Sequence, residues 1–251
     1  MEAGLGSVFT RKLEQFAPLG DEDRRVLDSI VARVRQVRAR TDLIREGERP
    51  KGVHLVLAGF ACRYKLLSDG RRQITAFLVP GDFCDLHVSI LSEKMDHGTA
   101  TLAPCTVVDI PREAILRLLE RPALARALWW ATLVDGAVLR QQVVSLGNRS
   151  AEVRAAHLLC ELLLRLRVVG LADGDAYELP LTQADLADAV GVTAVHMNRV
   201  LQALRSQGLI ASEGKTMAIP DLEGLRAFSG FSPNYLHLGP GQRASVAALA
   251  G

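Results

Sequence analysis

The chain has 251 residues, which is enough for one large domain or two smaller ones with an ample hydrophobic core. Hydrophobic residues make up 49% of it and charged residues 23%, as in a soluble globular protein, and the formal net charge is only +2. The sequence has no apolar run near the roughly 18 residues of a membrane span and no signal-peptide core at its N-terminus. We therefore expect a cytoplasmic protein with no membrane partner.

The first 121 residues are expected to form a β-roll sensor domain. A short helix is predicted after the Pro-Leu-Gly turn in the stretch FAPLGDEDRRVLDSIVARV. From Arg40 to Ile110 the pattern changes to short apolar segments divided by turns. The glycines that punctuate this region are Gly47, Gly52, Gly59, Gly70 and Gly81. This arrangement is typical of a small antiparallel roll or sandwich.

A long helix is predicted from Pro122 to about Ser145, and we assign residues 122–146 to it. Its apolar residues make two stripes, one with Leu124, Leu128, Ala131 and Val138 and the other with Leu133, Ala137 and Val144. The β-roll can cover one stripe, and the same helix of a second subunit is the expected cover of the other. The alternative is a helix buried wholly within one subunit.

A boundary is predicted at Leu146-Gly-Asn-Arg-Ser, where Gly147 and Asn148 can end the long helix. Ser150 can cap the helix that follows. We expect a hinge between the sensor half and the C-terminal half at this boundary, and we assign residues 147–228 to the second domain.

Two short helices that meet at a tight turn are predicted between Leu181 and Ile210. Thr182 and Thr193 can cap them, and Gly191 tolerates the positive φ that the turn needs. The residues expected to be buried are Leu186, Ala189 and Val190 on the first helix and Met197, Val200, Leu201 and Leu204 on the second. The opposite face of the second helix has no apolar stripe, so we expect it to be exposed to solvent. This pattern indicates a helix-turn-helix, whose second helix enters the DNA major groove.

A hairpin is predicted after the second helix, where IASEGKTMAI reads as two short strands around Glu213-Gly214-Lys215. A helix-turn-helix followed by such a hairpin is a winged helix. From Leu146 onward the chain carries 9 Lys and Arg against 10 Asp and Glu. Any positive surface for DNA must therefore be local, centred on Arg199, Arg205 and Lys215.

The β-roll, the long helix, SLGNRSAEVRAAHLLCELLLRL and TQADLADAVGVTAVHMNRVLQALRSQGLI with its GKT-type wing together resemble the Crp/Fnr family of bacterial transcription regulators. The resemblance covers about Phe16 to Phe228 and is strongest in the C-terminal half. It implies an α+β fold with an N-terminal, jelly-roll-like β-roll sensor domain, a long dimerisation helix and a C-terminal winged helix-turn-helix domain. It also implies a homodimer that binds a palindromic operator in double-stranded DNA, contacts RNA polymerase and responds to an effector at the β-roll.

The resemblance puts the family's base-reading positions on Ala194, Val195 and Arg199. Alanine and valine can contact a thymine methyl, Arg199 suits bidentate contact with guanine, and Asn198 could read adenine. The positions better suited to phosphate are Thr193 and His196. We predict that Arg199→Ala abolishes specific binding. The complete set of expected DNA-binding residues is Thr182, Gln183, Thr193, Ala194, Val195, His196, Asn198, Arg199 and Lys215.

The sensor half departs from the family members that bind cyclic nucleotides. Those members carry Gly-Glu-Leu after a Gly-Asp-Phe turn, and then an Arg on the cyclic phosphate. Here Cys84-Asp85-Leu86 stands where that Glu is expected, and no Arg occurs between Arg72 and Arg112. Lys94 lacks the planar fork that holds a phosphate bidentately, so we predict no tight binding of cyclic AMP. The expected effector pocket consists of Gly81, Asp82, Phe83, Cys84, Asp85, His87 and His97.

A redox- or gas-sensing regulator with a metal or haem is the alternative for the sensor half. Thiolate and imidazole bind zinc, iron and haem, and Cys84-x-x-His87 lies shortly before Asp96-His97. One Cys and two His make an incomplete tetrahedral set, so Cys84, His87 and His97 stay candidates and no cofactor is assigned. The four cysteines, which include no C-x-x-C pair, are otherwise expected to be small buried hydrophobic residues: Cys62, Cys84, Cys105 and Cys160. The absence of cysteine before Cys62 argues against the N-terminal iron–sulfur cluster of some family members.

Other classes of function fit the sequence less well. No Walker loop, GxGxxG motif, Ser/His/Asp order or pair of carboxylates stands out, so we do not expect an enzyme. An interaction protein that does not bind DNA is the second alternative, and it would fail to select any sequence from a random DNA pool. Residues 229–251 are rich in Gly, Pro, Ser and Ala and are expected to form a flexible tail, although Tyr235-Leu-His-Leu could pack back.

Overall fold

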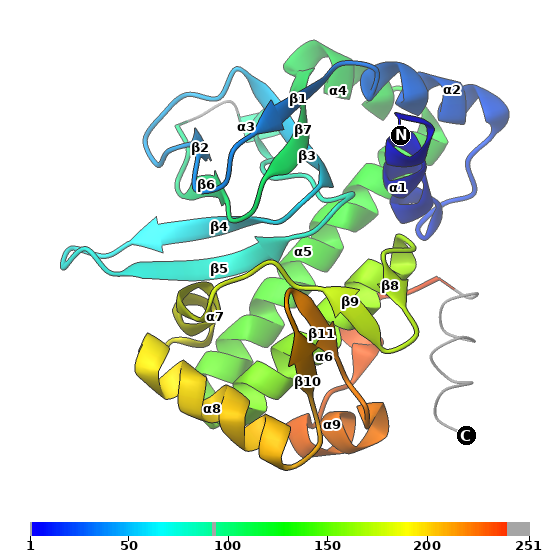
Figure 1. Cartoon of the computed structure of the whole chain (residues 1–251). Coiled ribbons are helices and arrows are strands. Elements are labelled where there is room, and N and C mark those ends of the chain that lie inside the picture. Colours follow the sequence, from blue (N-terminus) through cyan, green and yellow to red (C-terminus); the bar gives the residue numbers. More distant parts are fainter. Residues whose placement is uncertain (1, 92–93, 240–251) are drawn as a thin grey trace. The chain divides into compact units, whose positions relative to one another are not determined.

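The computed structural model describes residues 2–91 and 94–239 (Figure 1). The chain forms two compact units, residues 1–135 and residues 136–251. The first unit contains the predicted β-roll and the second contains the predicted winged helix-turn-helix. No helix in these two described stretches is long and apolar enough to cross a membrane.

Two helices precede the strands, α1 (Glu2–Glu14) and α2 (Asp21–Ile30). The first turn of α2 carries three acidic residues, which interact favourably with the positive end of the helix dipole. α1 is a helix that the sequence analysis did not predict. Phe9 and Leu13 of α1 are buried in the core of the first unit, and this burial offsets the low helix propensity of Gly4 and Gly6.

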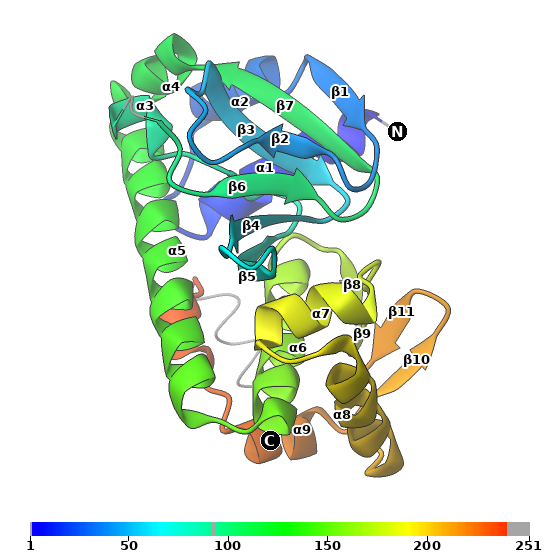
Figure 2. The same cartoon turned by 90° about the vertical axis from the view of Figure 1, so that its left-hand side faces the viewer.

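Antiparallel strands form the β-roll as two sheets, as predicted (Figure 2). One sheet has the order β1-β7-β3 and consists of β1 (Val34–Val37), β7 (Cys105–Pro111) and β3 (Gly52–Ala58). The other has the order β2-β6-β4-β5 and consists of β2 (Asp42–Ile44), β6 (Gly98–Thr101), β4 (Ala61–Leu66) and β5 (Arg72–Leu78). The short helices of this unit are α3 (Val88–Leu91) and α4 (Arg112–Leu119). Leu55 and Val108, which are opposite each other in β3 and β7, join Phe9 and Leu118 in one core.

Two glycines of the β-roll allow close approaches that a side chain would block. Gly59 has φ +85°, and a Cβ atom there would lie 2.2 Å from the carbonyl oxygen of Pro104. Gly98 is the first residue of β6 and packs against the ring of Tyr64, which would be 2.4 Å from an added Cβ. Both positions therefore require glycine.

The long helix α5 (Pro122–Asn148) runs without a break over 27 residues. Leu124 and Leu128 of the first predicted stripe are buried, and Trp130 stacks on Phe16 with 5.9 Å between ring centroids. In the second predicted stripe, Leu133 and Val144 are exposed in the single chain and Ala137 is buried. The large apolar residues exposed along α5 are Trp129, Leu133, Leu139, Val143 and Val144.

The second unit is built around α6 (Ala151–Val168), most of which is buried. α6 begins where predicted, because the Ser150 hydroxyl accepts a hydrogen bond of 3.4 Å from the amide of Val153. The elements that follow the helix-turn-helix are β10 (Ala211–Glu213), β11 (Thr216–Ala218) and α9 (Leu222–Ser229). The predicted wing pair extends to a sheet of order β10-β11-β9-β8 through β8 (Ala172–Asp173) and β9 (Ala176–Glu178), which were not predicted.

The segment after α9 packs against α6. A short 3₁₀ helix, η1 (Pro233–Leu236), brings Tyr235 to Glu161, whose carboxylate accepts a hydrogen bond of 2.8 Å from the tyrosine hydroxyl. The ring of His157 lies 4.9 Å from that of Phe231 and 5.8 Å from that of Tyr235. The alternative that Tyr235-Leu-His-Leu packs back therefore describes this segment, and the packing includes Phe231. Residues 240–251 lie outside the described residues.

Candidate nucleic-acid interface

The two helices of the helix-turn-helix are α7 (Gln183–Val190) and α8 (Ala194–Ser206). Thr182 caps α7 through its hydroxyl, which accepts from the Asp185 amide at 3.2 Å, while the Asp185 carboxylate accepts from the Thr182 amide at 2.9 Å. Gly191 ends α7 in the left-handed conformation, with φ 74°. Thr193 then caps α8, since its hydroxyl accepts from the His196 amide at 3.2 Å. The predicted caps and turn are confirmed.

The inner faces of α7 and α8 pack as the spacing predicted. All the residues expected to be buried are buried: Leu186, Ala189, Val190, Met197, Val200, Leu201 and Leu204. Asp185 is also fully buried, and its carboxylate pairs with the amide of Thr182. This packing fixes the rotation of α8 about its axis and determines which side chains face outward.

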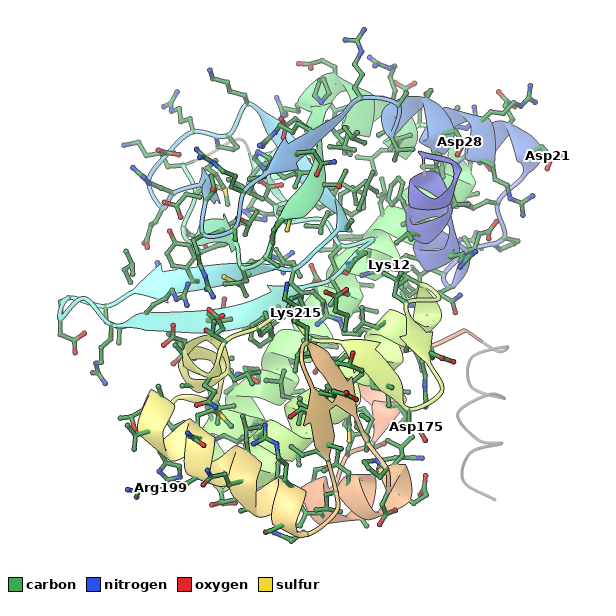
Figure 3. All side chains as sticks on the ribbon, in the orientation of Figure 1. Lys12, Asp21, Asp28, Asp175, Arg199 and Lys215 are labelled. Atoms are coloured by element: carbon green, nitrogen blue, oxygen red, sulfur yellow. The ribbon has the colours of Figure 1, made fainter. Side chains whose placement is uncertain are left out.

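The outer face of α8 collects the residues that the sequence analysis assigned to DNA. Thr193, Ala194, Val195, His196 and Arg199 are exposed, and Asn198 is half-buried. Val195 is 67% exposed, which is unusual for a β-branched apolar residue on a helix that buries its other face. Arg199 projects from α8 (Figure 3) and forms no hydrogen bond or ion pair with any residue that the structure describes. The arginine is therefore available to an external partner.

The wing adds a second cation next to the helix-turn-helix. β10 and β11 pair with Glu213 opposite Thr216, and the turn between them contains Gly214 at φ 58° and the exposed Lys215 (Figure 3). A hollow of about 190 Å³ brings Lys215 together with Gln183 of α7 and Arg205 of α8. Arg205 also donates a hydrogen bond of 3.2 Å to the Ser212 hydroxyl of β10. This local cluster supplies the positive charge that the composition of the C-terminal half lacks.

The sensor residues of the Gly81-Asp82-Phe83 turn have structural partners. Gly81 has φ 92°, and the buried Asp82 carboxylate accepts a 2.7 Å hydrogen bond from the amide of Val79 and pairs with Lys12. The ring of Phe83 packs edge-on against Phe9 with 5.4 Å between centroids. These contacts hold the turn against the core, and the carboxylate of Asp82 is engaged by Val79 and Lys12.

Cys84 and Asp85 point into the interior of the first unit. Cys84 is fully buried in a small apolar cluster with Val56, Ala61 and Leu78, and this burial raises the pKa of its thiol well above the ordinary value. Asp85 is also fully buried and accepts hydrogen bonds from the amide of His54 at 2.7 Å and from its Nδ1 at 2.6 Å. Burial lowers the pKa of His54, but the hydrogen bond and charge of Asp85 outweigh it, and the net shift is upward.

His87 and His97 lie together, and Asp96 completes their group. The ring centroids of the two histidines are 5.5 Å apart, and donor atoms of all three residues lie within 4.8 Å of one another. Cys84 does not belong to this group. The metal candidates grouped by sequence proximity are thus separated, because the pair of histidines faces Asp96 while the cysteine faces the apolar core.

Arg63 is a partly buried cation that the sequence analysis missed. Its guanidinium donates hydrogen bonds to the carbonyl oxygens of Cys84 at 2.7 Å and Phe83 at 2.8 Å, and to the Asp135 carboxylate of α5 at 2.7 Å. The charge of Asp135 opposes the desolvation of Arg63 and keeps its pKa raised. The reason for the miss is that β4 contributes Arg63 from outside the segment searched for a phosphate-binding Arg.

Two family models match the chain where these two sites lie. Residues 34–122 match a cyclic nucleotide-binding domain, and residues 153–228 match a Crp-like helix-turn-helix domain. Among solved structures, FixK2 from Bradyrhizobium japonicum is similar with a TM-score of 0.69 and 26% identity, over 80% of this chain and 98% of that one. The CooA mutant from Carboxydothermus hydrogenoformans shares the fold with a TM-score of 0.62 and 19% identity, over 78% of this chain and 87% of that one.

Curated relatives are regulators by name. The nitrogen fixation regulation protein FixK of Bradyrhizobium diazoefficiens is 34% identical over 157 residues, which is 62% of this chain and 65% of that protein. The transcriptional activatory protein AadR of Rhodopseudomonas palustris is 30% identical over 194 residues, or 76% of this chain and 79% of that one. The transcriptional activator protein Anr of Pseudomonas protegens is 28% identical over 84% of this chain and 86% of its own. The chain therefore belongs to the Crp/Fnr family of transcription regulators, with a cyclic nucleotide-binding-type β-roll and a DNA-binding helix-turn-helix.

Proposed function

We propose that this regulator acts in the cytoplasm as a homodimer that reads the two halves of a palindromic operator with its two α8 helices. The observation that carries the proposal is the outer face of α8, where Val195 and Arg199 are exposed and Arg199 has no partner among the described residues. Val195 and Ala194 would contact thymine methyls, Arg199 a guanine and Asn198 an adenine. Backbone phosphates would be held by Thr182, Gln183, Thr193, His196 and Lys215.

The dimer rests on the exposed apolar side of α5. At about 100° per residue, Trp129, Leu133, Leu139, Val143 and Val144 fall within one arc of about 140° on this helix, which makes a broad stripe. An apolar stripe of this length is typical of a helix that pairs with another helix. Pairing of this stripe with α5 of a second copy would give a two-fold dimer, and the symmetry of that dimer matches a palindromic site.

The β-roll would receive the effector, and cyclic AMP is not the ligand that its residues favour. The guanidinium of Arg63 is engaged by Asp135 and two carbonyl oxygens, and the Asp85 carboxylate is engaged by His54. Neither is available to a cyclic phosphate or a ribose without breaking these bonds. The relatives that are named as transcriptional activators support contact with RNA polymerase as part of this proposal.

The test of base reading is Arg199→Ala, measured by fluorescence anisotropy on duplexes that the wild-type protein selects from a random pool. Each half-site loses one bidentate arginine–guanine contact, so binding should weaken by about 1–3 kcal/mol, or roughly 5- to 150-fold, for each of the two half-sites. Affinity for a scrambled duplex should change much less, because phosphate contacts supply that affinity.

Arg226→Ala is the charge-matched control for this test. Arg226 belongs to α9 and pairs with Glu223 at 2.8 Å, so its removal changes the net charge equally without touching α8. We expect near-wild-type affinity and sequence preference from this variant. Equal losses for the two variants, or an unchanged preference in Arg199→Ala, would show that Arg199 does not read a base.

A further inference from the structure

We propose that His87, Asp96 and His97 form a binding site for a divalent transition metal ion in the β-roll unit. His87 immediately precedes α3, whereas Asp96 and His97 immediately precede β6, so the fold brings together two separate chain segments. The ring centroids of His87 and His97 lie 5.5 Å apart, and one donor atom from each of the three residues lies within 4.8 Å of the others. Small side-chain rotations bring such donors to the spacing found around one metal ion.

The hydrogen bond between Asp96 and His97 identifies the donor atom that His97 offers. Nδ1 of His97 lies 2.6 Å from Oδ1 of Asp96, so the proton of the neutral ring is held at Nδ1. Nε2 is then a lone-pair donor, and it is buried without a hydrogen-bond partner among the described residues. A buried polar atom without a partner costs about 1–3 kcal/mol, and a bound metal ion would remove this cost. Carboxylate–histidine pairs of this kind are the usual support of metal-bound histidines.

His87 is only partly buried, so its ring can be reached from solvent. Asp96 is the solvent-facing member of the group, with 84% of its side chain exposed, and it gives an ion a route from solvent. The nearby ammonium of Lys65 pairs with the Asp96 carbonyl oxygen and with Glu46, so its charge is partly neutralised.

The donor set determines the class of ion. Two imidazole nitrogens, one on a ring that a carboxylate orients, suit Zn²⁺, Fe²⁺, Co²⁺ and Ni²⁺, whereas Mg²⁺ and Ca²⁺ prefer an all-oxygen set. Two protein donors leave the remaining coordination positions to water or a small ligand, as in zinc sites that are not purely structural. Cys84 takes no part, because its thiol lies in the apolar cluster with Val56, Ala61 and Leu78. The proposal does not depend on DNA binding, so it can fail or succeed independently of the proposed function.

The test is calorimetric titration of Zn²⁺ into tag-free, chelator-treated protein without DNA. We expect one ion per chain for the wild-type protein and loss of this binding in His97→Ala and His87→Ala. Asp96→Asn, at an exposed position that tolerates substitution, should bind about 10- to 100-fold more weakly. Cys84→Ala is the matched control and should bind like the wild type. Thermal unfolding of each metal-free variant checks that the fold is intact.

Co²⁺ gives a second readout of the same site. The visible spectrum of the Co²⁺ protein should show nitrogen and oxygen ligation, without the charge-transfer band of a thiolate ligand. The proposal is overturned if the wild-type protein does not saturate at one ion per chain, or if Asp96→Asn and His97→Ala both bind Zn²⁺ like the wild type. It is equally overturned if binding is lost in Cys84→Ala and the Co²⁺ spectrum contains a thiolate band.

Discussion

At the scale of single residues, His54 of the β-roll lies between two carboxylates. His54 pairs through Nδ1 with the fully buried Asp85, and its Nε2 lies 3.6 Å from a carboxylate oxygen of Asp109. Arg35 holds the other side of that carboxylate, with 2.5 Å between its Nε and Asp109. The protonated form of His54 is therefore favoured in the folded protein over the unfolded chain.

This pairing predicts a pH dependence of stability. The folded-state pKa of His54 is raised above its ordinary value near 6.5, so its contribution to the free energy of unfolding is complete below about pH 6.5 and declines as the pH rises through the folded pKa. In urea unfolding, the stability difference between the wild type and His54→Gln should be larger at about pH 6 than at about pH 8.5. A difference that is constant or grows with pH contradicts the pairing.

His157 changes the stability in the opposite direction as the pH varies. The pH profile of the wild type alone therefore does not report on His54, and the comparison with a variant is needed. Burial, followed by the charge of Arg149, lowers the pKa of His157 to about 4. The second unit therefore loses stability as the pH falls below about 6.5 toward that value. The wild-type profile combines both histidines, whereas the His54→Gln difference isolates the β-roll.

At the scale of secondary-structure elements, the caps of the helix-turn-helix fix where its helices begin. Thr182→Ala removes the hydroxyl that accepts from the Asp185 amide at the start of α7. We expect a loss of about 1 kcal/mol in the free energy of unfolding, measured by urea denaturation. Thr182→Ser keeps the acceptor and should recover most of this loss. If Thr182→Ala and Thr182→Ser unfold alike, the hydroxyl is not the stabilising group.

The elements that were predicted correctly are those with local causes. Thr182, Gly191 and Thr193 act on amides and turns within a few residues, so their types and spacing are sufficient to locate α7 and α8. α1 was missed because its stability comes from the burial of Phe9 and Leu13 in a core contributed by distant strands. For the segment after α9, composition left flexibility and packing of Tyr235-Leu-His-Leu both open, because the partner of Phe231 and Tyr235 is His157, more than seventy residues earlier.

The sensor residues show the same limit on sequence reasoning. Proximity in sequence grouped Cys84 with His87 and His97, but the chain between Cys84 and His87 turns the thiol into the core and the imidazole toward Asp96. Arg63 lies on another strand and reaches the same turn through long-range hydrogen bonds. Only the three-dimensional fold determines such neighbours, since no local pattern encodes them.

At the scale of the whole molecule, reading a palindromic operator requires two copies of the chain. Leu133→Glu combined with Val143→Glu would place two carboxylates on the exposed apolar stripe of α5, where both residues are exposed in the single chain. We expect sedimentation equilibrium to show dissociation into monomers, since each buried carboxylate must be desolvated in the dimer. Leu66→Glu, at an exposed leucine of β4, is the control and should stay dimeric. A dimer that persists in the double variant would place the interface elsewhere.

The central claim is that a dimer of this chain reads a two-fold symmetric DNA sequence, and selection from a random pool of duplexes tests it most directly. We predict enriched sites with two inverted half-sites whose centres lie about 10–10.5 base pairs apart, and a G·C pair in each half-site that Arg199→Ala no longer selects. The absence of any enriched sequence, or enrichment of a single asymmetric site by a monomer, would contradict it.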